Sequence, residues 1–326
     1  MKKASIIILL IAVWTIYLSD EIRCQTPGAP SQEEFELYEK ASQEKDLAAK
    51  QKLLLEAVQK HPKSTLDPNI SYEYAKIYAD LRAKGSWQQM ADAAEKYLQH
   101  RPSDQISIAA ASESYQKLGN PQKLVAFGTK LYSTAPSTGT AYFVAKAYQA
   151  LEDGPNFLKW AERTLKHDPN NLEMLVEVTT VYWRMQNLPQ AATSAQQILQ
   201  ALQTAKKPGE LTVEQWSTKV NQVRAFAYGA IGEAAYAKND VGGALKNLEA
   251  AVKANKRYDF AYYRLGFLYW KAGRIDEACM SFAKAFVLEG ASSPDARNQL
   301  YNLYQTTRGN TKGVTPIIQQ ARESLK

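Results

Sequence analysis

Hydrophobic positions between residues 262 and 285 fall on two stripes of helical spacing, and a short turn separates the stripes. Within each stripe the apolar residues recur every three or four positions, as they do on one face of an amphipathic helix. The intervening Ala272-Gly273-Arg274 is typical of a turn, because glycine adopts backbone conformations that other residues avoid. The two stripes consist of Leu265, Gly266 and Tyr269, then Ala278, Phe282 and Ala285. The pattern predicts a helical hairpin.

The same pattern occurs 34 residues earlier, where Gly232 takes the place of Gly266. Self-similarity at this period is typical of stacked helical hairpins. A single hairpin cannot cover its own apolar face, so neighbouring hairpins must pack against it. Gly266 would let the facing helix approach closely, while Tyr269 and Phe282 would fill the wider gaps. The earlier copy continues with Ala244, Leu248 and Ala251.

These positions resemble the tetratricopeptide repeat (TPR), whose 34-residue signature places an aromatic residue, Leu-Gly and Tyr on helix A and Ala, Phe and Ala on helix B. The matching positions here are Tyr262, Leu265-Gly266, Tyr269, Ala278, Phe282 and Ala285. Gly290 stands where the signature closes with Pro, so the last turn departs from it. The resemblance implies an exported bacterial TPR protein with an all-α fold, a right-handed α-solenoid of about eight helix-turn-helix repeats.

Helix-ending prolines extend the period towards the amino terminus, since Pro102, Pro136 and Pro169 follow one another at intervals of 34 and 33 residues. The first repeat is degenerate, because Lys50 occupies a position that the pattern gives to alanine. We divide the chain into a signal peptide or anchor (1–24), a linker (25–30), N-terminal TPR-like repeats (31–205), an irregular insertion with an extended helix (206–224), two strong TPR repeats (225–292) and C-terminal capping helices (293–326).

The array is interrupted after residue 205 by Lys206-Lys207-Pro208-Gly209, and residues 211–238 are then predicted to form one long helix. Thr212 and Gln215 have the spacing of a capping box at its start. The extra turns around Trp216 and Val220 should project past the body of the stack. They are either a tolerated insertion at the edge of the solenoid or a lip that forms part of a binding groove or a dimer contact.

The amino terminus has the features of an export signal, because Lys2-Lys3 precedes an apolar run at residues 6–18. A helix of that length covers about 20 Å, which is short for a membrane span. Three outcomes are open: cleavage after Cys24, an uncleaved anchor in which residues 6–18 tether the protein to the membrane, or lipid modification of Cys24. Each predicts an exported protein, either periplasmic or membrane-anchored and facing the periplasm.

Composition and charge exclude several classes of function. The net charge of +7 comes from 40 basic and 33 acidic residues, without the Lys/Arg run of a nucleic-acid-binding patch. The chain contains no phosphate-binding glycine loop, no HExxH and no GxSxG motif. Its three histidines fall near the ends of second helices, and its two cysteines form no disulfide framework. We therefore expect no catalytic residues, no metal site, no cofactor and no enzymatic activity.

The candidate site is the inner wall of the solenoid, to which helix A positions 2, 5, 9 and 12 of a TPR contribute. Aromatic side chains exposed there are typical anchors for a protein or peptide partner, although they could instead pack against a neighbouring helix or the inserted lip. The terminal-carboxylate clamp of some TPR proteins needs Lys and Asn where this chain has Gly229 and Glu233. The candidate partner-binding residues are Tyr142, Lys146, Trp183, Arg184, Phe226, Tyr236, Phe260, Tyr263, Phe267 and Trp270.

Three functions fit these observations. The first is an extracytoplasmic scaffold that binds a protein segment in an aromatic-rich concave groove. The second is a structural component of an envelope or secretion assembly, held by an N-terminal anchor, in which the convex face and the inserted lip make the contacts. The third is a binder of a small molecule, such as a carbohydrate or a lipid, that uses the same aromatic residues.

Overall fold

The computed structural model describes residues 30–326, and these form sixteen α-helices and no strand. The helices pack as eight consecutive pairs, so each odd-numbered helix is the first helix of a pair and each even-numbered helix is the second. The first four pairs are α1 Gln32–Gln43 with α2 Leu47–Lys60, α3 Asp67–Ala83 with α4 Trp87–Leu98, α5 Gln105–Lys117 with α6 Pro121–Thr134, and α7 Thr138–Ala150 with α8 Gly154–His167. The last four are α9 Leu172–Arg184 with α10 Leu188–Thr204, α11 Val213–Ala237 with α12 Val241–Ala254, α13 Asp259–Lys271 with α14 Ile275–Val287, and α15 Ser293–Arg308 with α16 Val314–Ser324.

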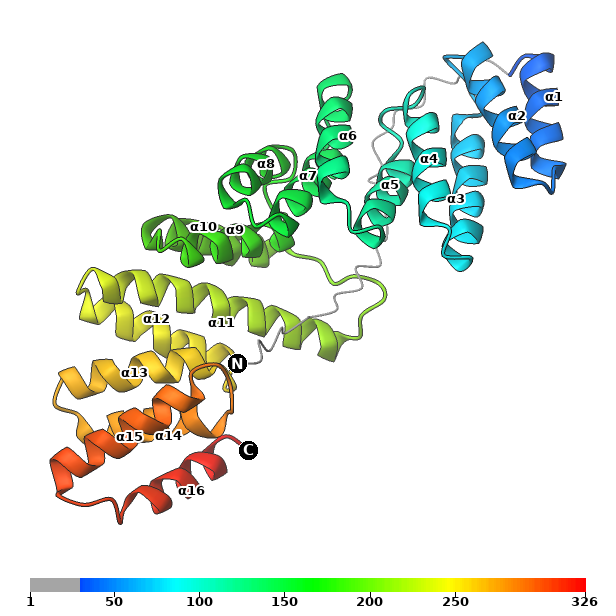
Figure 1. Ribbon diagram of the computed structural model, residues 1–326. Coiled ribbons are helices and arrows are strands. Elements are labelled where there is room, and N and C mark those ends of the chain that lie inside the picture. Colours follow the sequence, from blue (N-terminus) through cyan, green and yellow to red (C-terminus); the bar gives the residue numbers. More distant parts are fainter. Residues whose placement is uncertain (1–29) are drawn as a thin grey trace.

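The pairs follow one another along an open arc from α1 to α16 (Figure 1). Buried hydrophobic residues form separate clusters along this arc, from α1–α6 at one end to α14–α16 at the other. A core that grows along one dimension is the property that defines a solenoid. The prediction of an all-α solenoid of about eight helix-turn-helix repeats is confirmed.

Six of the turns between first and second helices share one backbone geometry. In each, the residue after the C-cap of the first helix is left-handed, with φ between 57° and 75°. These residues are Gly85, Gly119, Glu152, Gln186, Asn239 and Gly273. In four of the turns the next residue is Asn or Asp, whose side chain accepts a hydrogen bond from the third residue of the second helix. One short turn therefore ends the first helix and caps the second.

The predicted close approach of paired helices occurs at the glycines of the repeat pattern. A Cβ atom built on Gly266 would lie 2.5 Å from the ring of Phe282, whose side chain is fully buried. In the preceding pair, a Cβ atom built on Gly232 of α11 would lie 2.8 Å from Leu248 of α12. The glycine on the first helix thus leaves the space that the large side chain on the second helix occupies.

Lys50, which departs from the repeat pattern, is accommodated by an ion pair. Its ammonium lies 2.5 Å from the carboxylate of Glu73 on α3, and both side chains are almost completely buried. Glu73 also accepts a hydrogen bond from Lys76, at 2.6 Å. A buried lysine at this position is tolerated because the next pair supplies its counter-ion.

Helix α11 has 25 residues and carries the predicted capping box between Thr212 and Gln215. Its N-terminal end extends beyond the neighbouring helices on the open side of the arc (Figure 1). Val213 is 75% exposed there, and Trp216 and Val220 are half-buried.

The predictions for residues 1–24, including the fate of Cys24 and the tether at residues 6–18, lie outside the described residues, as does most of the linker. Within residues 30–326, none of the helices combines the length and the hydropathy required to span a bilayer. Cys279 is a free, buried thiol on α14.

The glycine geometry predicts opposite effects for two Gly→Ala substitutions. Alanine favours a helix over glycine by about 1 kcal/mol. At Gly266 the new methyl group would displace the buried Phe282 ring, so we expect a net loss of about 1–2 kcal/mol in the free energy of unfolding. A Cβ atom on Gly242 of α12 would have its nearest neighbour 3.9 Å away, so Gly242→Ala should raise the free energy of unfolding by up to about 1 kcal/mol. Urea unfolding measures both, and stabilisation by Gly266→Ala would contradict the packing described here.

Candidate functional site

Three aromatic rings from three successive first helices lie against one another. Trp183 on α9 is 5.8 Å from the ring of Phe226 on α11 and 5.1 Å from that of Phe260 on α13, as measured between ring centroids. All three side chains are half-buried. Residues far apart in sequence thus form one patch, because α9, α11 and α13 stack side by side.

A second aromatic group follows along α13. Tyr263, Phe267 and Trp270 are three or four residues apart and therefore share one face of the helix. Phe267 is 5.0 Å from Tyr263 and 6.4 Å from Trp270. Phe267 also contacts the buried ring of Phe282, at 5.1 Å between centroids. This contact connects the group on α13 to the hydrophobic core. Trp270 is 41% exposed, the largest exposure among the predicted aromatic residues.

Arg264 connects the two groups. Its guanidinium lies 5.4 Å from the ring centroids of both Tyr236 and Phe260, and 5.9 Å from that of Tyr263. It also donates a hydrogen bond to the carboxylate of Glu233 on α11, at 2.5 Å. We call the connected set the aromatic surface; it consists of Trp183, Phe226, Tyr236, Phe260, Tyr263, Phe267 and Trp270.

The Glu233–Arg264 pair lies beneath this surface, and burial is the largest influence on the pKa of Glu233. Glu233 is only 7% exposed. Burial raises the pKa of the Glu233 carboxyl, while the neighbouring Arg264 charge opposes part of that rise. The cation fixes the rings by contacting three of them, and the carboxylate fixes the cation.

The Glu233–Arg264 pair follows a spacing that recurs along the array. Four of the polar contacts between neighbouring first helices join residues 31 positions apart, about one helical turn less than the 34-residue repeat. The same separation occurs in Arg82–Glu113, Tyr142–Glu173 and Lys146–Glu177. Arg264 was missed in the sequence analysis because it lies outside the TPR inner-wall positions, and a search for opposite charges at this separation would have found it.

Tyr142 and Lys146 on α7 do not join the aromatic surface. We expected Tyr142 to be an exposed anchor, but it is only 8% exposed, and its hydroxyl donates to Glu173 at 2.5 Å. Burial, together with the charge of Glu173, raises the pKa of that hydroxyl. Lys146 donates to Glu177 at 3.1 Å. These two residues connect α7 to α9, and their polar atoms are already bonded within the chain.

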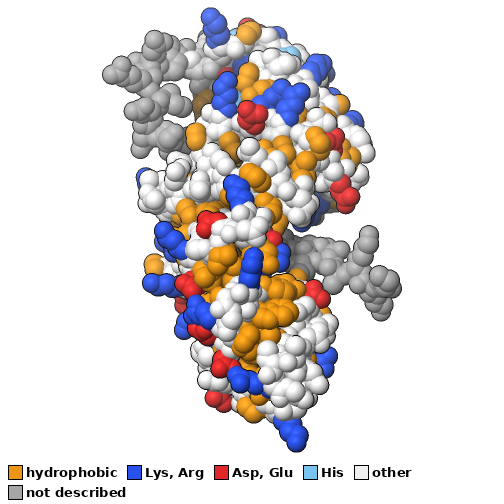
Figure 2. Space-filling view, turned by 90° about the vertical axis from the view of Figure 1, so that its left-hand side faces the viewer, with side chains coloured by type: hydrophobic (Ala, Val, Ile, Leu, Met, Phe, Trp, Pro, Cys, Tyr) orange, Lys and Arg blue, Asp and Glu red, His pale blue; other side chains and the backbone are white. Residues whose placement is uncertain are grey.

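Arg184, the remaining predicted residue, is exposed at the end of α9. The face of the molecule in Figure 2 carries hydrophobic side chains over its lower, C-terminal half, with Lys and Arg side chains beside and between them. Among residues 30–326, no group of three or more His, Cys, Asp or Glu residues could hold a metal ion.

Comparison with known proteins gives structural likeness at low sequence identity. No family model and no curated protein matches the chain. The crystal structure of MamA is 20% identical, with a TM-score of 0.41 over 55% of this chain and 93% of that one. YrrB, described as a TPR protein with an unusual peptide-binding site, is 14% identical, with a TM-score of 0.43 over 64% and 95%. A tetratricopeptide repeat protein from Parabacteroides merdae is 14% identical, with a TM-score of 0.37 over 84% and 99%.

The chain has a TPR-like fold, as its own geometry demonstrates. Paired helices recur at the TPR period, and the small and large side chains of the signature face each other in the core.

The raised pKa of Glu233 predicts a specific pH dependence. The folded protein binds this proton more tightly than the unfolded chain, so protonation of Glu233 favours folding. This contribution is fully present below the ordinary Glu pKa of 4.5 and is lost as the pH rises through the folded-state value. Relative to Glu233→Gln, the wild-type protein should therefore gain stability as the pH is lowered from about 7 towards 4.5. Chemical unfolding of both proteins across this range measures the difference, and a gain in the opposite direction would refute the assignment.

Proposed function

We propose that this protein is a non-catalytic scaffold that binds a protein or peptide segment in a groove along the first helices of its C-terminal repeats. The observation that carries the proposal is the aromatic surface, which three stacked first helices build and a partly buried ion pair holds in place. Preorganised aromatic rings are effective anchors, because they offer a large apolar area and lose little entropy on binding.

The geometry favours an apolar partner segment. The rings of Trp183, Phe226 and Phe260 continue towards Tyr263 and Trp270 along the stack, so the surface extends over three repeats. A segment that lies across it, either as a helix or as an extended strand, can place several apolar side chains on successive rings. Arg264 donates to one carboxylate oxygen of Glu233, while the other oxygen and the Arg264 Nε are buried without a hydrogen-bond partner in the described part of the chain. The rings that surround this pair make the central contact with the partner apolar.

A second candidate is a structural role in an envelope or secretion assembly. The observation that favours it is the projecting end of α11, where Val213 is 75% exposed and no second helix runs alongside. In that role the partner would contact this end and would leave the aromatic surface free.

We further propose an extracytoplasmic location, with the repeats in the periplasm. Support comes from the sequence, in which two lysines precede a short apolar run at residues 6–18. Cleavage after Cys24 would release the repeats, whereas retention of residues 6–18 would tether them to the membrane.

A substitution at the exposed end of the aromatic surface should abolish partner binding and leave the fold intact. We expect Trp270→Ala combined with Phe267→Leu to weaken the binding of a selected peptide at least about 30-fold, because truncation of an interface anchor typically costs 2 kcal/mol or more. Leucine at 267 preserves an apolar contact with Phe282. Peptides selected by display against the wild-type protein supply the ligand, and calorimetry gives the affinities.

Phe35→Ala provides the matched control, since Phe35 is an exposed aromatic residue on α1, at the far end of the array. It should leave binding unchanged. If Val213→Ser with Trp216→Ser abolished binding while the substitutions at 267 and 270 did not, the partner would contact α11, and the second candidate would replace the first.

The proposed export predicts the mature amino terminus. Mass spectrometry of the protein purified from its native cells should find a chain that begins at Gln25. An intact Met1 in the membrane fraction would indicate the anchored form. Recovery of full-length protein from the cytosol alone would contradict both forms.

A further inference from the structure

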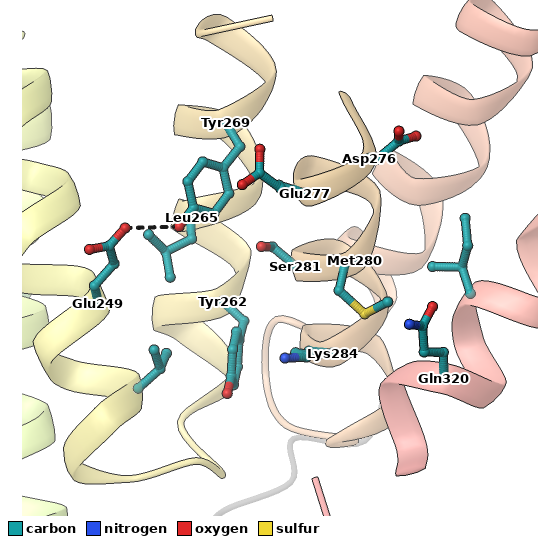
Figure 3. Close-up of a pocket in the computed structure, with 12 residues that line it drawn as sticks. Glu249, Tyr262, Leu265, Tyr269, Asp276, Glu277, Met280, Ser281, Lys284 and Gln320 are labelled. Atoms are coloured by element: carbon teal, nitrogen blue, oxygen red, sulfur yellow. Dashed lines mark hydrogen bonds between the residues drawn. The ribbon is translucent and has the colours of Figure 1, made fainter. Parts of the chain in front are cut away.

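A cavity of about 620 Å³ lies apart from the aromatic surface, between α12, α13, α14 and α16 (Figure 3). Its volume is within the range of pockets that hold small organic ligands. Its lining residues extend across these four helices, from Glu249 on α12 to Gln320 on α16. None of its lining residues belongs to the aromatic surface.

Half of the twelve residues that line this cavity are apolar or aromatic. Val252 on α12, Leu265 on α13, Met280 on α14 and Ile317 on α16 line it, together with the ring of Tyr262. These residues favour a ligand with an apolar body, because transfer of apolar surface from water to such side chains is favourable.

The three carboxylates at the cavity are already engaged. Glu249 accepts a hydrogen bond from the hydroxyl of Tyr269 at 2.9 Å. Arg274 donates to Glu277 at 2.6 Å, and Arg308 donates to Asp276 at 2.7 Å. Figure 3 shows Glu249 and Glu277 together near Tyr269, at one end of the cavity. This end is occupied by internal contacts and would repel an added anion.

The other end holds a cation with no internal partner. No carboxylate in the described part of the chain pairs with Lys284, whose ammonium lies 5.4 Å from the centroid of the Tyr262 ring. Burial, and the charge of Lys256, lower the pKa of Lys284, as expected for a cation that lacks a counter-ion. Ser281 lies one helical turn earlier on α14, and its hydroxyl has no hydrogen bond to another described residue. Figure 3 places Ser281 and Lys284 along the same wall.

We propose that this cavity binds a small monocarboxylic acid with an apolar body, whose carboxylate is held by the Lys284 ammonium and the Ser281 hydroxyl and whose body packs against Tyr262, Leu265 and Met280. A carboxylate would supply the counter-ion that Lys284 lacks, in a partly buried place where a charged hydrogen bond is strong. A diacid is disfavoured, because its second charge would meet Glu249 and Glu277.

A carbohydrate fits the cavity less well, although carboxylates and tyrosines line it. Sugars stack on open aromatic faces and bond to carboxylates that are available to accept. Here Arg274 lies 4.4 Å from the ring centroid of Tyr269, and Lys284 lies over the Tyr262 ring. The carboxylates accept from Tyr269, Arg274 and Arg308.

The test uses octanoate as the probe and the full chain as the protein. Isothermal titration calorimetry should show that the wild-type protein binds octanoate and binds octanol at least tenfold more weakly, because octanol lacks the charge. Octanedioate should bind at least tenfold more weakly than octanoate. Lys284→Met retains the apolar stem and removes the ammonium, so it should weaken octanoate binding at least tenfold and leave octanol binding unchanged. Ser281→Ala should weaken octanoate binding by a smaller factor.

Lys246→Met on α12 is the matched control, since Lys246 is exposed and does not line the cavity. It should not change octanoate binding, and circular dichroism verifies that each variant is folded. Absence of octanoate binding to the wild-type protein, equal affinity for octanol, or unchanged octanoate affinity of Lys284→Met would each overturn the proposal. The measurement requires no protein partner, so its outcome is independent of the test of the aromatic surface.

Discussion

Close contact between the two helices of a pair is the constraint on which the rest of this structure depends. The ring of Phe282 occupies the space beside Gly266, where a Cβ atom would lie 2.5 Å from it. Gly232 and Leu248 make the equivalent contact one repeat earlier. These contacts set how closely the two helices of a pair approach each other. Repetition of this helix–helix contact along the chain therefore produces an extended arc and not a globule.

The stacking of pairs then determines which side chains meet. Neighbouring first helices are offset by about one helical turn from the sequence repeat, so four of the polar contacts between them join residues 31 positions apart. In the N-terminal half, this offset places opposite charges together, as in Arg82–Glu113. In the C-terminal half, it places Arg264 on Glu233 and, through its cation–π contacts, orders the rings of the aromatic surface. The same backbone relation thus stabilises the array at one end and arranges a candidate binding surface at the other.

Two features of the C-terminal repeats differ in chemistry and in position. The aromatic surface lies on the first helices and is broad, with its charged residues paired beneath the rings. The cavity lies among α12, α13, α14 and α16 and is open to solvent on one side, and its one unpaired charge faces the space. Helix α13 contributes to both, because Tyr263 and Trp270 lie on one of its faces and Tyr262 and Tyr269 lie on the neighbouring face, about 100° away. A single helix can therefore connect a surface suited to a protein with a cavity suited to a small ligand.

The sequence by itself determined the helical hairpins, their period, the array of eight pairs and the long helix with its capping box. These features are local, since they depend on apolar spacing, turn residues and caps within about 34 residues. The sequence also identified the aromatic residues that the first helices carry. Only the tertiary structure decided that Trp183, Phe226 and Phe260 meet while Tyr142 is buried against Glu173. It alone revealed Arg264 at the centre of the aromatic surface and the cavity beside Lys284. These contacts join residues on different pairs, and the stacking geometry that brings such residues together is not encoded in any single repeat.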